Sequence, residues 1–477
     1  MDDRDRRDDL DAWLHAQIEP LPPPPGTFEM IKRRARRRRY RQAAVTAAAV
    51  AAVAAAVIVV PRLATSVLNV NQNPAANGAA AKSPAPRPAA GHGTPGTSGS
   101  QEPAAQSAGP APAAPPPVPA DFAATSATFV GLQTGWVIGQ ARVPGQRCAT
   151  QYCTSVARTD NAGRSWYGVP APAAGAPDGA SGVSQIRFLN TEDGWAFGPQ
   201  LFATHDGGQH WTAVGTGGQR VITLETVGGH AFAIFATCAG TGPDFAAQCS
   251  SFSLYATPAA EDSWAPVSPT VTSLGHGGQA ASASLVLTSS RGYLLAPDGT
   301  LYSGPVSGTG SWQRAASGPA GGASCRTGTA QPDGQPAGAM LAAASASSLA
   351  LACAVPAASG GGAAVFTSAD GGATWQASGA VAGSMVTSVA AQPGGEIVLA
   401  TTRGLLVSQD SGASWQPAPS YGAATTAGPA DGFRFVGMTG TRQGVAVPEN
   451  PAEHAVWFTF TRGQSWQRFP IAGAASP

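Results

Sequence analysis

Short apolar runs separated by Gly and Pro fill the chain from residue 121 to residue 477. The runs consist mostly of Val, Phe, Leu and Ala, and none has the spacing of an amphipathic helix. Runs of this kind, with turn residues between them, are typical of β-strands joined by tight connections. The last 357 residues, 121–477, therefore predict one all-β domain.

A longer apolar segment lies near the N-terminus. Residues 43–60 carry no charge and follow residues 32–41, in which eight of ten positions are Lys or Arg. An uncharged run behind a basic flank is typical of a membrane-spanning helix whose basic side stays in the cytoplasm. We predict a single transmembrane helix over 43–62 in the plasma membrane, with 1–42 in the cytoplasm. A cleaved signal peptide is the alternative, but 42 residues precede the run and no A-x-A site follows it.

The segments on either side of the predicted span have different compositions. In the cytoplasmic segment Leu10, Trp13, Leu14 and Ile18 share one face of a short amphipathic helix. We interpret this helix as a spacer, with a docking peptide for a cytoplasmic partner as the alternative. Residues 63–120 are Ala, Pro, Gly, Ser and Gln with almost no large apolar side chain, which predicts a disordered linker.

The all-β segment contains a repeat that ends in tryptophan. Copies over residues 204–211, 368–375 and 408–415 fit S/T-x-D-x-G-x-x-W, and copies over 159–166 and 459–466 keep the frame without the Asp. The seven repeat tryptophans are Trp166, Trp211, Trp264, Trp312, Trp375, Trp415 and Trp466. Their spacing of 40 to 63 residues predicts seven structural units. Six or eight units remain alternatives, because the third and fourth copies keep little besides their tryptophan.

We expect the repeat residues to act on local structure rather than on a substrate. An Asp or Asn at the head of a tight turn accepts hydrogen bonds from following backbone N–H groups, and Gly supplies the positive φ that such a turn needs. The tryptophan should then enter the next strand facing inward. The residues given this turn role are Asn161, Gly163, Trp166, Asp206, Gly208, Trp211, Asp370, Gly372, Trp375, Asp410, Gly412, Trp415, Gly463 and Trp466.

The repeat resembles the Asp-box, or BNR repeat, of sialidases, sortilin-type receptors and photosystem II assembly factor-like proteins. In these families the box forms the hairpin between the last two strands of each propeller blade. The resemblance therefore implies a β-propeller with Asp206, Asp370 and Asp410 stapling turns on its rim. A further phrase, G-W-x-x-G before the first two boxes at 135–139 and 194–198, looks most like the photosystem II assembly factor branch.

The predicted fold is thus an all-β, seven-bladed β-propeller tethered to a single N-terminal transmembrane helix. We expect its ring to close by pairing a strand from near residues 121–129 with the final unit. Exposed polar and aromatic residues that could line a propeller face are His205, His210, Arg187, Tyr152 and Arg434. None of them defines a binding site by its position in the sequence.

All six cysteines follow the predicted span, and an even number in an external domain indicates disulfides. Six cysteines allow fifteen pairing schemes. Pairing between sequence neighbours strains the chain least, and it joins Cys148 with Cys153, Cys238 with Cys249, and Cys325 with Cys353. None of the pairs has the C-x-x-C spacing of a zinc site. We therefore expect neither a metal ion nor a cofactor.

Charge adds little to the functional interpretation. With 28 Lys and Arg against 27 Asp and Glu, the chain has a net charge of +1, which argues against nucleic acid as a partner. The Arg-Ile-Pro signature that sialidases of the Asp-box group usually carry is absent, and no spacing singles out a Tyr/Glu pair.

We therefore favour a membrane-anchored, extracytoplasmic β-propeller that acts as a non-catalytic protein-interaction or assembly module and binds its partner on a propeller face. One alternative is glycan binding or sialidase-like glycoside hydrolysis. The other is a transmembrane sensor with a cytoplasmic regulatory peptide.

Overall fold

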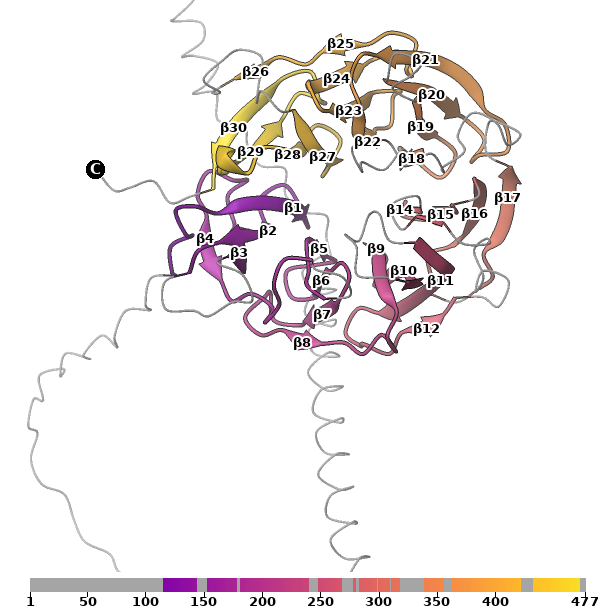
Figure 1. Ribbon diagram of the computed structural model, residues 1–477. Helices are drawn as coiled ribbons and strands as arrows, with labels where there is room; N and C mark the ends of the chain where they lie inside the picture. The colour runs from indigo at the N-terminus through magenta and orange to yellow at the C-terminus, as the bar shows by residue number, and fades with distance from the viewer. Residues whose placement is uncertain are drawn as a thin grey trace, which may run out of the picture. The chain divides into compact units, whose positions relative to one another are not determined.

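The described residues of the computed structural model form seven sheets arranged in a ring (Figure 1). The model describes residues 115–143, 152–177, 181–239, 248–267, 278–279, 283–297, 299–308, 310–317, 339–355, 362–421 and 432–471. Each sheet is one blade, and consecutive strands run outward from the ring axis. The protein is a seven-bladed β-propeller, which confirms the predicted all-β class and the count of seven units.

The first three blades follow one another without a strand exchanged between them. Blade 1 contains β1 (Ala123–Phe129), β2 (Gly135–Ala141), β3 (Cys153–Thr159) and β4 (Tyr167–Val169). Blade 2 contains β5 (Gln185–Phe188), β6 (Gly194–Phe197), β7 (Leu201–Thr204) and β8 (Thr212–Ala213). Blade 3 contains β9 (Arg220–Val227), β10 (His230–Ala239), β11 (Gln248–Pro258) and β12 (Ala265–Pro266), with β13 (Gly278–Gln279) paired to β11.

The other four blades repeat the same order. Blade 4 contains β14 (Ser284–Leu287), β15 (Arg291–Leu295), β16 (Thr300–Pro305) and β17 (Gln313–Ser317). Blade 5 contains β18 (Ala339–Ala343), β19 (Leu349–Val355), β20 (Gly362–Ser368) and β21 (Gln376–Ala382). Blade 6 contains β22 (Val386–Ala391), β23 (Ile397–Thr401), β24 (Gly404–Ser408) and β25 (Gln416–Pro417). Blade 7 contains β27 (Phe433–Met438), β28 (Gly444–Pro448), β29 (Ala455–Thr459) and β30 (Trp466–Pro470), with the 3-10 helix η5 (Pro451–Glu453) before β29 and β26 (Ser420–Tyr421) parallel to β30.

The middle strands of a blade are apolar on both faces because both faces are covered. In β2, Trp136 and Ile138 pack in the cluster shared with blade 2, whereas Val137 and Ala141 pack in the cluster shared with blade 7. Successive side chains of a strand point to opposite faces, so one strand supplies both junctions. The buried core is therefore divided into seven clusters, each between two neighbouring blades.

The expected mode of ring closure was wrong. The strand β1 pairs with β2 in its own blade, and all strands of the last sheet come from residues after 419. Blades 7 and 1 instead meet face to face through the cluster that contains Phe122, Val447 and Phe458. His454 Nδ1 lies 3.0 Å from the carbonyl oxygen of Phe122 across the same junction. A packed face replaces a shared strand here because β1 already has a partner in its own hairpin.

One of the three predicted disulfides is confirmed, and parts of the other two lie outside the described residues. Cys238 and Cys249 are opposite each other on the outer part of the β10–β11 hairpin and form a disulfide. Cys153 and Cys353 are also disulfide-bonded. Cys148 and Cys325, which we predicted as their partners, are not among the described residues.

The predicted N-terminal segments, 1–42, 43–62 and 63–114 of the linker, also lie outside the described residues. Within the part of the chain that the structure describes, no helix has the length and apolar character needed to cross a membrane. The transmembrane helix over 43–62 stays a prediction.

Replacing Trp136 should separate the role of the junctions from that of the repeat turns. Trp136→Ala removes a fully buried ring between blades 1 and 2, and we expect a loss of about 3–5 kcal/mol in the free energy of unfolding. The half-buried Trp375 donates its ring N–H to Gly372 of its own turn and packs at the edge of the cluster between blades 4 and 5, so Trp375→Ala should destabilise less. Urea unfolding followed by circular dichroism measures both, and a larger loss for Trp375→Ala would contradict this ranking.

Candidate functional site

Each repeat turn joins the third and fourth strands of its blade, and its polar side chains bond to its own backbone. In blade 5 the hydroxyl of Ser368 accepts from the N–H of Gly372 at 2.8 Å and donates to Asp370 Oδ1 at 2.8 Å. Asp370 Oδ1 also accepts from the N–H of Thr374 at 2.8 Å. Gly371 and Gly372 both have positive φ, of 70° and 89°, which a side chain disfavours.

The same hydrogen bonds recur in the other clear repeat turns. The first Ser or Thr accepts from the Gly N–H over 2.7–3.0 Å in the pairs Thr159–Gly163, Thr204–Gly208, Ser408–Gly412 and Thr459–Gly463. Asn161, Asp206 and Asp410 each accept from the backbone N–H four residues later, at 2.9 Å. These contacts occupy the oxygens of the three aspartates within the turns.

The repeat tryptophans differ in burial. Trp166, Trp312 and Trp466 are buried, whereas Trp211, Trp264, Trp375 and Trp415 are half-buried. Each of the seven nevertheless belongs to, or packs against, one of the clusters between blades.

The two tryptophans of the G-W-x-x-G phrase each link their own blade to the next one. Trp136 Nε1 donates to the carbonyl oxygen of Gly207 in blade 2 at 3.1 Å, and Trp195 Nε1 donates to Asp262 in blade 3 at 3.4 Å. In blade 4 the hydroxyl of Tyr293 donates to the carbonyl oxygen of Ala346 in blade 5. The repeated G-W motif was the sequence signal for these contacts, but it did not reveal that the hydrogen-bond partner lies in the neighbouring blade.

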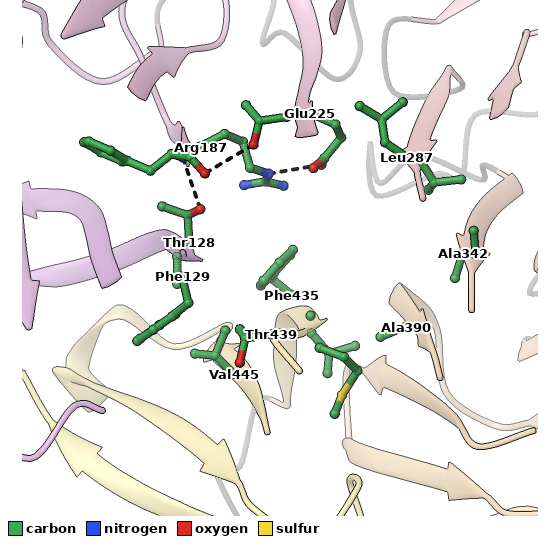
Figure 2. A pocket seen from close by; sticks show the side chains of 18 of the residues that line it. Thr128, Phe129, Arg187, Glu225, Leu287, Ala342, Ala390, Phe435, Thr439 and Val445 are labelled. Carbon is green, nitrogen blue, oxygen red and sulfur yellow. Dashed lines mark hydrogen bonds and ion pairs between the residues drawn. The ribbon is translucent and has the colours of Figure 1, made fainter. Parts of the chain in front are cut away.

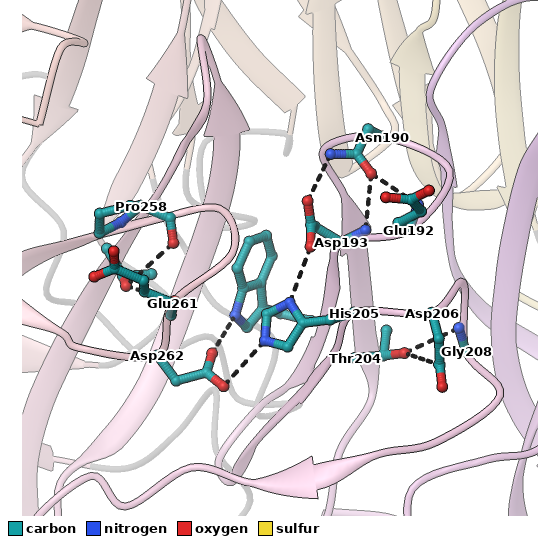
Figure 3. Close-up of polar contacts among 12 residues, drawn as sticks. Asn190, Glu192, Asp193, Thr204, His205, Asp206, Gly208, Pro258, Glu261 and Asp262 are labelled. Atoms are coloured by element: carbon teal, nitrogen blue, oxygen red, sulfur yellow. Dashed lines mark hydrogen bonds and ion pairs between the residues drawn. The ribbon is translucent and has the colours of Figure 1, made fainter. Parts of the chain in front are cut away.

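A cluster of charged side chains joins blades 2 and 3 near Trp195 (Figure 3). His205 Nδ1 lies 2.9 Å from Asp193 Oδ1, and His205 Nε2 lies 3.3 Å from Asp262 Oδ2. Burial alone lowers the pKa of His205, but the hydrogen bonds and charges of Asp193 and Asp262 outweigh it, so the pKa rises above 6.5. The His205 ring thus lies between two carboxylates from different blades, an arrangement that favours its protonated form.

The hydrogen bonds that hold the repeat turns together also lower the pKa values of their aspartates. Hydrogen bonds from the Thr374 hydroxyl and N–H lower the pKa of Asp370 to about 2, and those from Ser414 lower the pKa of Asp410 to about 2. Burial acts in the opposite direction on Asp206, but hydrogen bonds from His210 still lower its pKa to about 2. A carboxylate of this kind is a poor general base at neutral pH.

The innermost strands surround a cavity of about 520 Å³ at the ring axis (Figure 2). All seven blades contribute to its wall, mainly with small or apolar side chains. The wall residues include Ala127, Thr128, Phe129, Leu287, Ala342, Ala390, Phe435, Met438 and Thr439. Among the described residues that line it, Arg187 and Glu225 are the charged ones.

Arg187 and Glu225 form an ion pair on the cavity wall. Arg187 Nε lies 3.0 Å from Glu225 Oε1, and the Arg187 guanidinium carbon lies 5.6 Å from the centre of the Phe435 ring. Arg187 Nη1 also donates to Ser126 Oγ at 3.2 Å. Figure 2 shows Arg187 and Phe435 extending into the opening from blades 2 and 7. Arg187 therefore places a fixed, partly neutralised cation in a mostly apolar wall.

Ser and Thr side chains bond the backbones of neighbouring innermost strands. Thr128 Oγ1 accepts from the N–H of Phe188 at 3.2 Å, and Thr226 Oγ1 donates to the carbonyl oxygen of Phe188 at 3.2 Å. Ser388 donates to the carbonyl oxygen of Val436 at 3.3 Å in the same manner. The strands at the axis have no further strand to pair with, so these hydroxyls satisfy their free edges.

The face residues named from the sequence do not converge on one place. Arg187 lines the axial cavity and His205 joins blades 2 and 3, whereas His210 bonds to Asp206 within its own turn at 2.6 Å. The Tyr152 hydroxyl contacts Arg142 at 3.2 Å, and Arg434 pairs with Glu449 at 3.2 Å. Sequence separation concealed the contact between Arg187 and Glu225, which are 38 positions apart.

The cavity offers limited acid–base chemistry. Glycoside hydrolysis by the common mechanisms needs two carboxyl groups, and Glu225 is the one carboxylate among the described wall residues. Its Oε1 is already paired with Arg187. No group of three or more His, Cys, Asp and Glu among the described residues has the geometry of a metal site.

Fold and cavity together define a seven-bladed β-propeller with an axial cavity to which every blade contributes. No protein-family model matches the chain, and no curated protein matches it. Among solved structures, YCF48 bound to D1 peptide is 16% identical with a TM-score of 0.46, over 72% of this chain and 95% of that chain. YCF48 from Cyanidioschyzon merolae is 14% identical with a TM-score of 0.45, over 73% and 98%.

An enzyme is among the similar structures as well. The GH74 enzyme of Niastella koreensis is 13% identical with a TM-score of 0.34, over 74% of this chain and 66% of that chain. At these identities and TM-scores the likeness concerns the propeller fold alone.

Acid should weaken the protein through the turn aspartates. Because the folded-state pKa of Asp370 is about 2 and its ordinary value is 3.8, the stabilisation is present above pH 4 and is lost as the pH falls through 2. We expect Asp370→Asn to destabilise at pH 5 and to match the wild type near pH 2. Asn161 makes the same backbone bond, so the variant should fold. Urea midpoints between pH 5 and pH 2 test this, and a pH-independent difference would contradict it.

The His205 cluster should give the opposite pH dependence. Because its folded-state pKa is raised above 6.5, the stabilisation is complete below pH 6.5 and is lost as the pH rises through the folded-state value. His205→Gln should therefore lower the melting temperature at pH 6 more than at pH 9. A titration of the His205 ring proton by NMR gives the folded-state pKa directly. A midpoint at or below 6.5 would overturn the assignment.

Proposed function

We propose that the protein is a membrane-anchored, extracytoplasmic β-propeller that binds another protein at its axial cavity and catalyses no reaction itself. The observation that carries the proposal is the cavity wall, to which all seven blades contribute mostly small or apolar side chains, with Thr128, Thr226, Thr439 and the Arg187–Glu225 pair among them. A wall of this kind suits a protein segment that offers an apolar side chain together with polar groups, which is how protein segments are anchored in a partner's pocket.

The paired state of Glu225 supports binding rather than catalysis. A general acid or base must exchange its proton with the substrate, whereas Glu225 Oε1 accepts from Arg187 at 3.0 Å. Arg187 is itself fixed by Ser126 and by the carbonyl oxygen of Ile186 at 2.8 Å. Such a fixed pair positions a ligand group by charge and hydrogen bonding.

The anchoring and the location rest on the sequence and the disulfides. The basic run 32–41 before the apolar run 43–60 supports a span with its N-terminus in the cytoplasm. Disulfides at Cys153, Cys353 and between Cys238 and Cys249 support an oxidising location for the propeller. The linker residues 63–114, which precede the segment that packs on the propeller at Val118, then give the propeller reach above the membrane surface.

We also infer that the repeat turns are Asp-boxes. The Ser or Thr, the Asp or Asn and the Gly of each clear copy form the same internal hydrogen bonds, as in Thr204, Asp206 and Gly208. In this interpretation the boxes shape the ring and take no part in binding.

Site-specific photocrosslinking in native membranes tests the proposal. A photoreactive residue at Met438 or Leu287, both on the cavity wall, should give one reproducible protein adduct. The same residue at the exposed Ala260 of blade 3 should not. Arg187→Ala should reduce the adduct, while extraction of the membranes with alkaline carbonate should leave the full-length chain in the pellet.

Two outcomes would contradict the proposal. Adducts of equal yield from Ala260 and Met438 would mean that the cavity is not the binding place. No protein adduct at either cavity position would remove the protein-binding function and bring glycan binding forward, which a glycan array with the same preparation then measures.

A further inference from the structure

Corresponding positions at the junctions between blades hold side chains of very different size. The residue before Trp136, before Trp195 and before Ala350 pairs with the Ser or Thr that opens the repeat turn of the same blade. Trp136, Trp195 and Ala350 therefore occupy equivalent positions in blades 1, 2 and 5. Each belongs to the cluster shared with the following blade.

Two aromatic rings fill the junction between blades 1 and 2. Trp136 stacks on Phe188 with 3.8 Å between ring centroids and 5° between ring planes. Trp136 Nε1 donates to the carbonyl oxygen of Gly207, and its ring is fully buried. This junction shows which groups an inter-blade space of this kind accommodates: two stacked rings and one ring N–H bonded to a backbone carbonyl.

The junction between blades 5 and 6 lacks both rings. Ala350 occupies the position of Trp136, and Ala391 occupies the position of Phe188. Both equivalences follow from the strand registers, because each alanine has the same place in its hairpin as the aromatic residue that it replaces. A cavity of about 250 Å³ lies there, lined by both alanines and by Ser411. Ser411 is the blade 6 counterpart of Gly207, three residues after the first Ser of its repeat turn.

The cavity also has polar groups in its wall that lack partners. Gln392 and Glu396 are 3% and 8% exposed, and both line the cavity. Among the described residues neither Gln392 Nε2 nor Glu396 Oε2 has a hydrogen-bond partner, although Glu396 Oε1 accepts from Arg462 at 3.0 Å. Buried polar groups are almost always paired, so these two mark a place where a partner group is missing.

We propose that this cavity binds a small planar aromatic molecule that carries a ring N–H, of which indole is the simplest example. The missing rings leave a cavity between Ala350 and Ala391 at the place that two stacked rings fill between blades 1 and 2. A cavity left by large apolar side chains can take up a small aromatic molecule. The ring N–H donates to the carbonyl oxygen of Ser411, as Trp136 donates to Gly207. The exposed Thr374 and Gln376 at its rim leave the cavity open to solvent.

This site is separate from the axial cavity of the proposed function. It lies between two blades and shares with the axial wall only Ala391. A ligand here acts on the packing of blades 5 and 6, whatever binds at the ring axis.

Fluorine NMR of 5-fluoroindole with the purified full-length chain tests the inference. Titration with the wild type should broaden and shift the fluorine signal in a saturable way. Ala350→Trp restores the ring found in blade 1, so it should abolish the saturable signal and raise the melting temperature. Ala260→Trp adds the same side chain at an exposed position of blade 3 and should leave binding unchanged.

A second ligand and a second variant keep the test decisive. Competition by 1-methylindole, which cannot donate, should be roughly 2- to 10-fold weaker than competition by indole, the range expected for one lost neutral hydrogen bond. Should Ala350→Trp fail to fold, Ala391→Phe fills the same space from blade 6. The inference is overturned if the wild type gives no saturable signal, or if a folded cavity-filling variant binds 5-fluoroindole as well as Ala260→Trp does.

Discussion

The packing of blade on blade is the constraint on which the rest of this structure depends. A middle strand such as β2 places Trp136 toward one neighbour and Val137 toward the other, so a blade alone would expose two apolar faces. Burial of both faces requires a neighbour on each side, and a ring is the arrangement that supplies one to every blade. Individual blades are consequently units of sequence but not of stability.

The ring also determines what its axis can offer. Seven innermost strands converge there, and their free edges are bonded by hydroxyls such as Thr128 and Thr226 rather than by another strand. The side chains at the axis leave a cavity, whereas rings such as Trp136 and Phe188 fill the junctions further out. The Arg187–Glu225 pair is stable in this wall because each charge has its partner at 3.0 Å. The axial cavity and the packed core are thus separated radially in the same blade.

Much of the fold could be predicted from the sequence because the repeat is local. The hydrogen bonds of each repeat turn lie within eight residues, as those of Ser368, Asp370 and Thr374 do, so the sequence motif contains all the residues that form the turn. Contacts between blades have no such motif. Asp262 contacts His205 from 57 positions away, and no sequence pattern near either residue indicates the other. Closure of the ring was mispredicted for the same reason, since a strand sequence does not state which edge it joins. The cavity at Ala350 became visible only after the registers aligned it with Trp136.

The chain order makes one junction unlike the other six. Consecutive blades are joined by the backbone, whereas blades 7 and 1 are held by non-covalent contacts such as the packing of Phe122 on Phe458 and the hydrogen bond between His454 and Phe122. Val118, before the first strand, and Ile471, after the last, lie in that same cluster, so both ends of the ring-forming chain enter and leave at one seam. Tension applied through the N-terminal segment would act on this seam directly. The ring is therefore closed at this one junction by non-covalent contacts, and circular permutation would move the non-covalent closure to another pair of blades.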